Sequence, residues 1–398
     1  MDILNVNHKA QFEDSVVALQ YYGFKPYNIT ALNENDEIRI AIQTENSYVL
    51  PSKSFISIKG EITTDANVEY PGKVVNNGFA HLFEEIKLNL NAETIDRVRN
   101  PGVTSLIKGI CSYNKMDCIK LENAGWVHPS IDKLSLIEKK KFNVCIPLTH
   151  LMGFAEDFTK IIINSKLELV LLRAKNTTNI TNGVVSKISL SDVEWLVPMV
   201  TVSDYEKLKL LKLLEHDKPL TIDFRSWQLY EHPTLPEATK ISWNVTTSPQ
   251  LQKPRIVIVG FQEDRNKIDK DGSHFDLCNV NDVTLFLNDK KYPHHSYGVD
   301  KENNIYGFFY EMYARFQESY YDRPSWPLLN RSDFVNHAPL FVFDCSKQHE
   351  DLKSGSVNVR IDISASKNVP ANTKAYCLII HDRSLEYTPL TNIVTSVI

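Results

Sequence analysis

The same strand-like octapeptide occurs twice in this chain. Residues 84–91 read EEIKLNLN and residues 281–288 read NDVTLFLN, which lies 288 − 91 = 197 residues further on. Both copies have an acid at the second position, aliphatic residues at the third, fifth and seventh, and a closing asparagine. This alternation is typical of a half-buried β-strand. Because every such strand alternates, the order and spacing of further segments must decide whether the match marks a repeat.

Further segments follow each octapeptide in the same order. An apolar helical segment comes first, SLIKGI at 105–110 and YGFFYEMYARF at 306–316. Three strand-like pairs follow. FNVCIPL pairs with LFVFDCS at an offset of 340 − 142 = 198 residues, and LELVLL pairs with VNVRID at 357 − 167 = 190. ISLSDVEWLVPMV pairs with IIHDRSLEYTPLTNIV at 386 − 194 = 192. The last pair sets Trp195 against Tyr387. Segments in one order at nearly constant spacing predict a tandem duplication of one β-domain.

The rest of each half also consists of strand-like segments with few helices between them. Runs such as EIRIAIQ and RIVIVGFQ are separated by loops rich in Asn, Asp, Gly and Pro. A parallel α/β sheet would need a helix after almost every strand, and the sequence does not contain them. We therefore predict an all-β chain of two tandem antiparallel jelly-roll sandwiches, a double jelly roll, with short inserted helices.

Two helical patterns suggest the domain boundaries. Ser203 followed by Glu206 is a capping box, and three leucines at helical spacing come after it. Phe12, Val16 and Leu19 also have helical spacing, which predicts a short amphipathic helix near the N-terminus. The expected organisation has four parts: an N-terminal helix and arm at 1–34, a first jelly roll at 35–202, a linking helix at 203–215 and a second jelly roll at 216–398.

Charge and cysteine usage limit the partners and the compartment. A net charge of −5 gives no overall attraction to a phosphate backbone, so we expect no direct sequence-specific binding of nucleic acid. The six cysteines form no CxxC pair and mostly lie in apolar runs, which favours reduced core residues. The first residues have no secretion pattern, and no apolar run of about 18 residues occurs, so we expect no transmembrane segment.

Common catalytic and cofactor motifs are absent from the sequence. It contains no GxxxxGK[ST], GxGxxG, HExxH or GxSxG. His294 and His295 have no third ligand nearby, which favours an exposed loop over a zinc site. The loop at 264–276 lacks the spacing of an EF-hand, which favours a solvated loop over a calcium site, although it carries four aspartates: Asp264, Asp269, Asp271 and Asp276. We expect no enzymatic activity, no catalytic residues, no cofactor and no bound metal.

An aromatic cluster occurs in ESYYDRPSWP at 318–327. It comprises Tyr320, Tyr321 and Trp326, with Arg323 among them. Such amphipathic rings can contact a glycan or another protein. They can also form a subunit interface, because Tyr, Trp and Arg are enriched in interface cores. Burial in a crossover loop is the third option, and the sequence leaves all three open. These four residues are the candidate interface.

Three segments of the second half carry a family resemblance: WNVTTSPQLQKPRIVIVGFQEDR, YGFFYEMYARFQESYY and CLIIHDRSLEYTPLTNIV. They resemble the double jelly-roll-like domain proteins encoded by virus-like elements in arthropod genomes. Two tandem jelly rolls with helices inserted after a middle strand also resemble the double jelly-roll major capsid proteins of icosahedral DNA viruses and polinton-like elements. The first half matches these families in its pattern of segments rather than in its amino-acid residues.

The resemblance implies a structural role as a capsid protein of a virion. In that family three subunits form a pseudohexagonal capsomer, so the expected partners are further copies of the chain, together with minor capsid or penton proteins. The expected location is the virion, after synthesis in the host cytoplasm and assembly there or in the nucleus. A duplicated domain suits this role, because two fused domains around a threefold axis give six near-equivalent edges.

Two other classes of function compete with this interpretation. A glycan- or protein-binding β-sandwich module, including a host-domesticated capsid relative, would have the same fold and an exposed aromatic platform. A cupin-like metalloenzyme would need His and Glu ligands on adjacent strands facing one barrel interior. Strands such as RIVIVGF have an apolar inner face instead, which disfavours the enzyme.

Overall fold

The fold is described from a computed structural model of the chain. The described residues are 15–27, 32, 34–43, 47–64, 73–91, 93–128, 137–138, 140–175, 179–182, 186–215, 218–246, 254–265, 267, 270–347 and 357–397.

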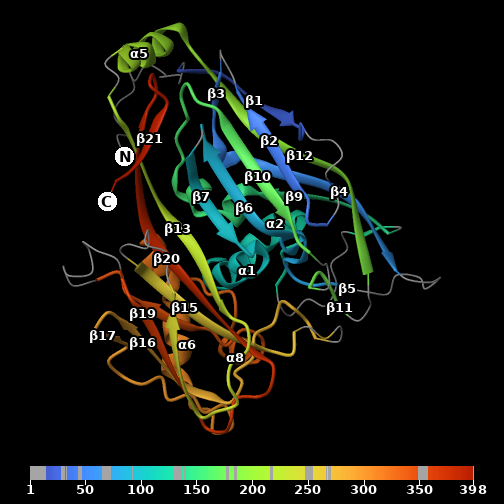
Figure 1. Cartoon of the computed structure of the whole chain (residues 1–398), viewed down its shortest axis with the longest axis vertical. Coiled ribbons are helices and arrows are strands. Elements are labelled where there is room, and N and C mark those ends of the chain that lie inside the picture. The colour runs from blue at the N-terminus through green and yellow to red at the C-terminus, as the bar shows by residue number, and fades with distance from the viewer. Residues whose placement is uncertain are drawn as a thin grey trace, which may run out of the picture.

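The first half is a sandwich of two antiparallel sheets (Figure 1). One sheet has the order β1-β12-β4-β9-β8, with β3 paired to β12, and the facing sheet has the order β2-β10-β6-β7. A small additional sheet pairs β5 with β11. The bounds are β1 Val16–Phe24, β2 Glu37–Ile42, β3 Tyr48–Val49, β4 Phe55–Thr64, β5 Lys73–Val74, β6 Phe83–Leu90, β7 Glu93–Arg99, β8 Ile137–Glu138, β9 Lys141–Pro147, β10 Leu167–Arg173, β11 Thr181–Asn182 and β12 Ser186–Val202.

The second half is also a two-sheet sandwich. Its sheets have the orders β13-β20-β15-β18, with β21 paired to β20, and β14-β19-β16-β17. The bounds are β13 Leu220–His232, β14 Lys240–Val245, β15 Pro254–Glu263, β16 Val280–Leu287, β17 Lys290–Tyr292, β18 Phe341–Asp344, β19 Val359–Ala365, β20 Thr373–Thr388 and β21 Ile393–Val397.

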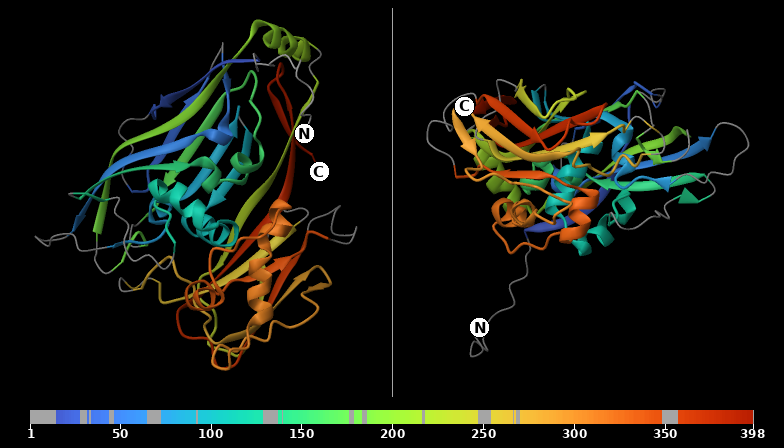
Figure 2. Two further views of the ribbon diagram at one scale, coloured as in Figure 1. Left: turned by 180° about the vertical axis from the view of Figure 1, so that it is seen from behind. Right: turned by 90° about the horizontal axis from the view of Figure 1, so that it is seen from below.

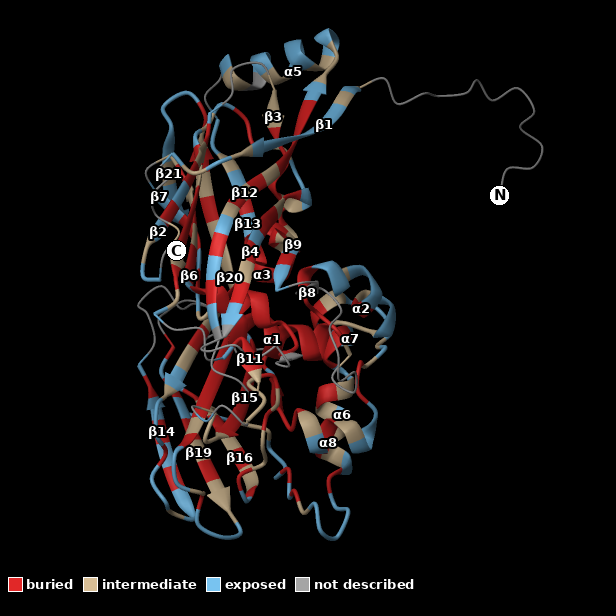
Figure 3. Cartoon of the chain, turned by 90° about the vertical axis from the view of Figure 1, so that its right-hand side faces the viewer, coloured by how far each residue is buried: buried red, intermediate tan, exposed pale blue. Residues whose placement is uncertain are grey.

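Short helices connect these strands. On one side of the sheets, α1, α2, α6, α7 and α8 lie near one another (Figure 3). The bounds are η1 Pro51–Lys53, η2 Gly78–Leu82, α1 Pro101–Ser112, α2 Lys115–Leu121, η3 Glu122–Ala124, α3 Leu148–Leu151, α4 Gly153–Asp157, α5 Asp204–Glu215, α6 Gly307–Ala314, α7 Phe316–Tyr321 and α8 Arg331–His337. In the described part of the chain, no helix is long and apolar enough to cross a membrane.

The two halves share one strand plan, which confirms the predicted fold class. The repeated octapeptides form β6 and β16, the third strand of each four-stranded sheet. Leu88 and Leu285 are fully buried, as expected, and stand opposite Leu169 and Ile361 in the neighbouring strand. This pairing corrects one predicted offset, because equivalent positions in β10 and β19 lie 361 − 169 = 192 residues apart rather than 190.

The closing strands also correspond, but not in the predicted register. Ile58 of β4 and Ile258 of β15 are counterparts, because each stands opposite the valine of its FNVCIPL or LFVFDCS segment. Ile58 pairs with Val193 of β12, whereas Ile258 pairs with Leu378 of β20, so the offset is 378 − 193 = 185 rather than 192. Alternating sequences look alike when they slide along a strand, so periodicity alone left this register undetermined.

The predicted N-terminal helix is wrong from residue 16 onward. Val16–Phe24 forms β1, which pairs antiparallel with β12 from Val202 to Trp195. The stretch VVALQYYGF is rich in β-branched and aromatic residues, and the free edge of β12 offers it a hydrogen-bonding partner. This pairing outweighs the weak helical spacing. Residues 1–14 lie outside the described residues, so the predicted arm there stays a prediction.

The predicted linking helix is present as α5. The backbone N–H of Lys207 donates to the carbonyl oxygen of Ser203 at 2.8 Å, which starts the helix at the expected cap. α5 joins β12 to β13 and lies at one end of the molecule rather than between the two sandwiches (Figure 1). Its Tyr205, Leu208 and Leu211 side chains are exposed.

The hydrophobic cores of the two halves interlock. α1 belongs to the first half, yet its apolar side chains pack into the core of the second: Val103, Leu106, Ile107 and Ile110. In return, the far ends of β13 and β20 enter the core of the first: Ile222, Phe224, Leu385 and Tyr387. Figure 2 shows these long strands running from the second sandwich along the first. The predicted division at 203–215 therefore follows the strand plan, whereas the cores cross it.

Candidate interdomain junction and assembly surfaces

A buried lysine lies where the two halves meet. Lys108 sits on α1, and its residue is 0% exposed. Its Nζ forms an ion pair with Glu156 of α4 and donates to the Tyr321 hydroxyl of α7 at 2.8 Å. It also lies 4.6 Å from the ring centroid of Trp227 on β13. A charge removed from water requires a partner and hydrogen bonds, and three different elements provide them here: α4, α7 and β13.

The carboxylate of Glu156 completes this arrangement. It accepts hydrogen bonds from the hydroxyls of Tyr320 at 2.7 Å and Tyr321 at 2.6 Å, in addition to the ion pair with Lys108. The indole N–H of Trp227 donates to the Tyr320 oxygen at 3.2 Å. We name these five residues the junction cluster: Lys108, Glu156, Tyr320, Tyr321 and Trp227. Its two tyrosines and Trp227 come from the second half, and Lys108 and Glu156 come from the first.

A second ion pair joins the same elements. The Arg225 guanidinium of β13 meets Asp157 of α4, with Nε to Oδ2 at 2.8 Å and Nη2 to Oδ1 at 2.5 Å. The Arg225 backbone N–H also donates to Asp157 at 2.8 Å. The guanidinium lies 3.7 Å from the Tyr320 ring centroid. Two-point pairing of this kind fixes orientation as well as distance, so it fastens α4 to β13.

The four candidate interface residues occupy different environments. Tyr320 is only 5% exposed and Tyr321 is half-buried, and both are engaged inside the chain as described above. The Arg323 guanidinium is exposed and lies 4.4 Å from the Tyr321 ring centroid. Trp326 is 69% exposed. The two tyrosines therefore contact other parts of the same chain, while the side chains of Arg323 and Trp326 are accessible to a partner.

Trp326 borders a shallow apolar hollow that the sequence interpretation did not include. The hollow has a volume of about 420 Å³ and is lined by Trp326, Pro327, Met116 and the residues that start α2. Met116 and Ile119 of α2 are exposed as well, and they lie three residues apart on one face of the helix. We name Met116, Ile119 and Trp326 the α2 patch. The only sign of this patch in the sequence was the three-residue spacing of Met116 and Ile119 within KMDCIKL.

The edge strand β1 is a second exposed apolar surface. Its burial pattern is exposed along almost the whole strand, with Val16, Val17, Leu19, Tyr21 and Tyr22 among the exposed large side chains. β1 lies at the edge of its sheet, and within the described ranges it pairs with β12 alone. A long apolar edge is a place where another chain can pair or pack, and folded proteins normally cover or charge such edges.

Among the described residues, the metal candidates of the sequence are exposed or paired with other side chains. His294 and His295 are both exposed. In the loop at 264–276 the carboxylates face different partners: Asp264 pairs with Lys267 and Asp276 pairs with Arg265. Asp269 lies outside the described residues. Across the described ranges, no group of three or more His, Cys, Asp and Glu side chains has the geometry to hold a metal ion.

The cysteine thiols match the expected reduced core residues. All six are free, and five of them are buried. Burial raises the pKa of the Cys118 thiol to about 11 and that of Cys278 to about 12. Because only the thiolate is a strong nucleophile, these two groups are unreactive near neutral pH.

Buried histidines make the fold sensitive to acid. Burial lowers the pKa of His150 to about 3 and the pKa values of His81 and His381 to about 4, from an ordinary value of 6.5. Each ring is neutral in the folded chain but becomes protonated below about pH 6.5 when the chain unfolds. The unfolded state then binds more protons, so stability falls as the pH drops from about 6.5 to about 4. Asp96 has the opposite effect on the pH dependence of stability. Burial raises its pKa, so the folded chain binds its proton more readily than the unfolded chain does.

We expect each of these histidines to remove about 2 kcal/mol of stability between pH 7 and pH 5. In His150→Gln this loss should be smaller by that amount, although the variant will be less stable at pH 7 because His150 contacts Tyr113 and Asn77 at 2.8 Å each. Urea unfolding at both pH values measures the difference. An unchanged loss in His150→Gln would show that this ring does not titrate on unfolding.

Comparisons with known proteins agree with this architecture. The model of the double jelly roll-like domain family matches residues 72–385. Among solved structures, the mavirus major capsid protein has a TM-score of 0.59 at 11% identity, with 99% of this chain and 92% of that chain covered. A chain of the Sputnik virophage has a TM-score of 0.59 at 10% identity, with 99% of this chain and 91% of that chain covered. A chain of the PBCV-1 virus capsid has a TM-score of 0.61 at 8% identity, with 98% of this chain and 99% of that chain covered. At these identities the likeness establishes the fold. A search of curated protein sequences returned no match.

Proposed function

Because the chain belongs to the double jelly roll-like domain family, we propose that it is a non-enzymatic capsid subunit whose trimers form pseudohexagonal capsomers of an icosahedral shell. One observation carries the proposal: the whole double sandwich matches chains of viral capsids over more than nine-tenths of both partners. Proteins that share only one sandwich would not match over both halves. The partners would be further copies of the chain, with minor capsid or penton proteins, and the location would be the virion.

The exposed apolar surfaces support assembly. β1 exposes apolar side chains along an unpaired sheet edge, and the α2 patch lies well away from it beside α7 (Figure 3). Two different surfaces on one subunit are what a closed ring requires, because each subunit contacts its neighbours through non-identical faces. A duplicated sandwich then supplies six similar blocks around a threefold axis. Within the candidate interface, we propose Trp326 and Arg323 as the contact residues, because both are exposed.

Analytical ultracentrifugation of the purified chain tests the proposal. We expect a trimer at micromolar concentration, and a six-lobed particle in negative-stain electron microscopy. Trp326→Ala should weaken the trimer by on the order of 2 kcal/mol of interface stability, the size typical of an interface hot spot. Tyr205→Ala is the matched control, since Tyr205 is similarly exposed but lies on α5 at the end of the molecule. A stable monomer would contradict the assembly proposal.

A glycan-binding module is the second candidate, and the exposed Trp326 ring beside a shallow hollow favours it. An aromatic face can stack on a sugar ring, and the polar residues at the start of α2 would donate to its hydroxyls. The two candidates predict different results for the same variant. A monomer that binds glycans and loses that binding in Trp326→Ala would favour the module over the capsid subunit.

A further inference from the structure

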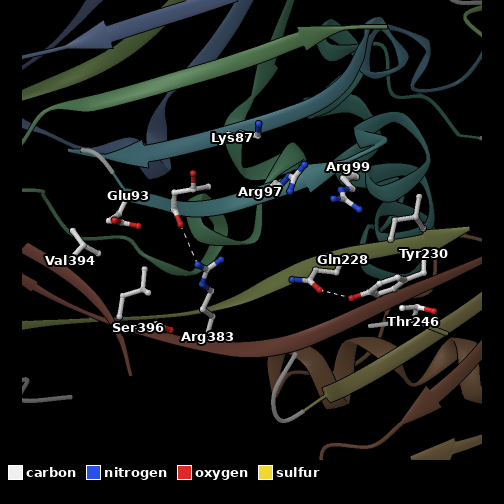
Figure 4. A pocket seen from close by; sticks show the side chains of 13 residues that line it. Lys87, Glu93, Arg97, Arg99, Gln228, Tyr230, Thr246, Arg383, Val394 and Ser396 are labelled. Atoms are coloured by element: carbon white, nitrogen blue, oxygen red, sulfur yellow. Dashed lines mark hydrogen bonds between the residues drawn. The ribbon is translucent and has the colours of Figure 1, made fainter. Parts of the chain in front are cut away.

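A groove with excess positive charge separates the two halves on the face opposite the helices. It lies between β6 and β7 of the first half and β13 and β20 of the second, and its volume is about 650 Å³. Lys87, Arg97 and Arg99 lie on the first wall, and Arg383 extends toward that wall from the second (Figure 4). Among the described residues that line it, the only acid is Glu93. The groove therefore presents four cations against one carboxylate.

A single buried acid serves three of these cations. The carboxylate of Glu85, at the base of the first wall, lies 2.7 Å from Nζ of Lys87, pairs with Arg97, and lies 3.8 Å from Nε of Arg99. One carboxylate balances one charge. With Glu85 and Glu93 both counted, the groove still has two more cations than carboxylates, and opposite charge from a ligand would be attracted there.

Arg383 on the second wall is the least compensated of the four. Its Nη2 donates to the carbonyl oxygen of Thr94 at 3.2 Å, and in the described part of the chain no carboxylate oxygen lies within ion-pair distance of it. Asp96 attracts it from further away, but that carboxyl is occupied by Ser226 at 2.8 Å and by the backbone N–H of Phe154 at 3.0 Å. Arg383 therefore extends across the groove to Thr94 of β7, and Arg97 and Arg99 lie further along the same wall (Figure 4).

We propose that this groove binds a compact multivalent phosphate, such as a triphosphate, between the two halves of the chain. Guanidinium groups match phosphate oxygens in pairs, and here they approach from two walls. The volume suits a small ligand. A long nucleic-acid track is disfavoured, because the whole chain carries a net charge of −5.

Binding would stabilise the chain by joining its halves. A ligand that contacts both walls binds the folded chain and not the unfolded one, so its presence raises the unfolding temperature by mass action. The effect would weaken with added salt, since the arginine side chains are partly exposed. All the groove residues described belong to one chain, so binding there can be measured separately from the proposed capsid role.

Isothermal titration of the full-length chain with inorganic tripolyphosphate at low salt tests the proposal. We expect one saturable site per chain and a higher unfolding temperature. In Arg99→Gln/Arg383→Gln the affinity should fall at least about tenfold for each charge removed, while the unfolding temperature without ligand stays close to that of the parent chain. Arg315→Gln is the matched control, because Arg315, between α6 and α7, is exposed to a similar degree as Arg99, 62% against 64%, and lies outside the groove.

Three outcomes would overturn the proposal. The first is no saturable binding of tripolyphosphate at millimolar concentration. The second is binding that survives in Arg99→Gln/Arg383→Gln or falls equally in Arg315→Gln, which would show attraction to surface charge in general. The third concerns a single-stranded oligonucleotide of about 20 residues as the competing probe. Tighter binding of that probe than of tripolyphosphate, lost in the same double variant, would assign the groove to a nucleic-acid backbone instead.

Discussion

Glu156→Gln should lower the free energy of unfolding by about 3–5 kcal/mol, the cost typical of removing one partner from a buried ion pair. The substitution keeps the shape of the side chain but removes its charge. Lys108 then remains enclosed with no carboxylate, and the Tyr320 and Tyr321 hydroxyls lose a charged acceptor. Urea unfolding followed by tryptophan fluorescence measures the change, since Trp227 lies in the junction cluster.

The double variant Lys108→Met/Glu156→Gln separates charge from packing. Methionine has nearly the length of the lysine stem, so the double variant removes both charges and keeps the apolar contacts with Trp227. We expect it to regain most of the stability lost in Glu156→Gln, because replacing both members of a buried pair is often neutral. If the free energy of unfolding of Glu156→Gln lies within about 1 kcal/mol of that of the parent chain, the Lys108–Glu156 pair is not the main connection between the halves.

The sequence identified the strands of this fold more securely than their registers. The repeat located β6 and β16 because it compared two segments, and that comparison does not depend on how any one strand pairs. Val193 and Leu378, in contrast, could be matched only through their ladders with β4 and β15. β1 was mistaken for a helix for a related reason: the edge of β12 that binds it belongs to residues about 180 positions away.

The junction cluster could not be predicted from the sequence as a unit. Lys108 is conspicuous in SLIKGI, because it is the one charge in an otherwise apolar helix. The neighbouring sequence does not indicate which residues contact it, because Glu156 lies 48 residues further on and Tyr321 lies 213 residues further on. The aromatic cluster at 318–327 was found, but its tyrosines act inside the chain. Only Trp326 and Arg323 keep the exposure that an interface residue needs.

Gly153→Ala should be as damaging as the loss of the buried charge, because α4 touches β13 backbone to backbone at this residue. A Cβ atom on Gly153 would lie 1.8 Å from the carbonyl oxygen of Arg225 and 3.0 Å from Nε1 of Trp227. Overpacking typically costs 1–3 kcal/mol and occasionally more, and we expect about 3 kcal/mol here because the obstacle is backbone rather than a movable side chain. α4 would have to withdraw from β13, and it carries Glu156 and Asp157, the two acids that hold Lys108 and Arg225.

Gly307→Ala provides the matched control for this substitution. Gly307 begins α6, and a Cβ atom there would meet nothing within 4 Å. The same chemical change should therefore leave stability unchanged or raise it by about 0.4–1 kcal/mol, because alanine restricts the unfolded chain more than glycine does. Urea unfolding of both variants under identical conditions compares them. Equal midpoints would mean that α4 can move away from β13 at little cost, and the junction would then depend on its side chains rather than on the close approach of the two backbones.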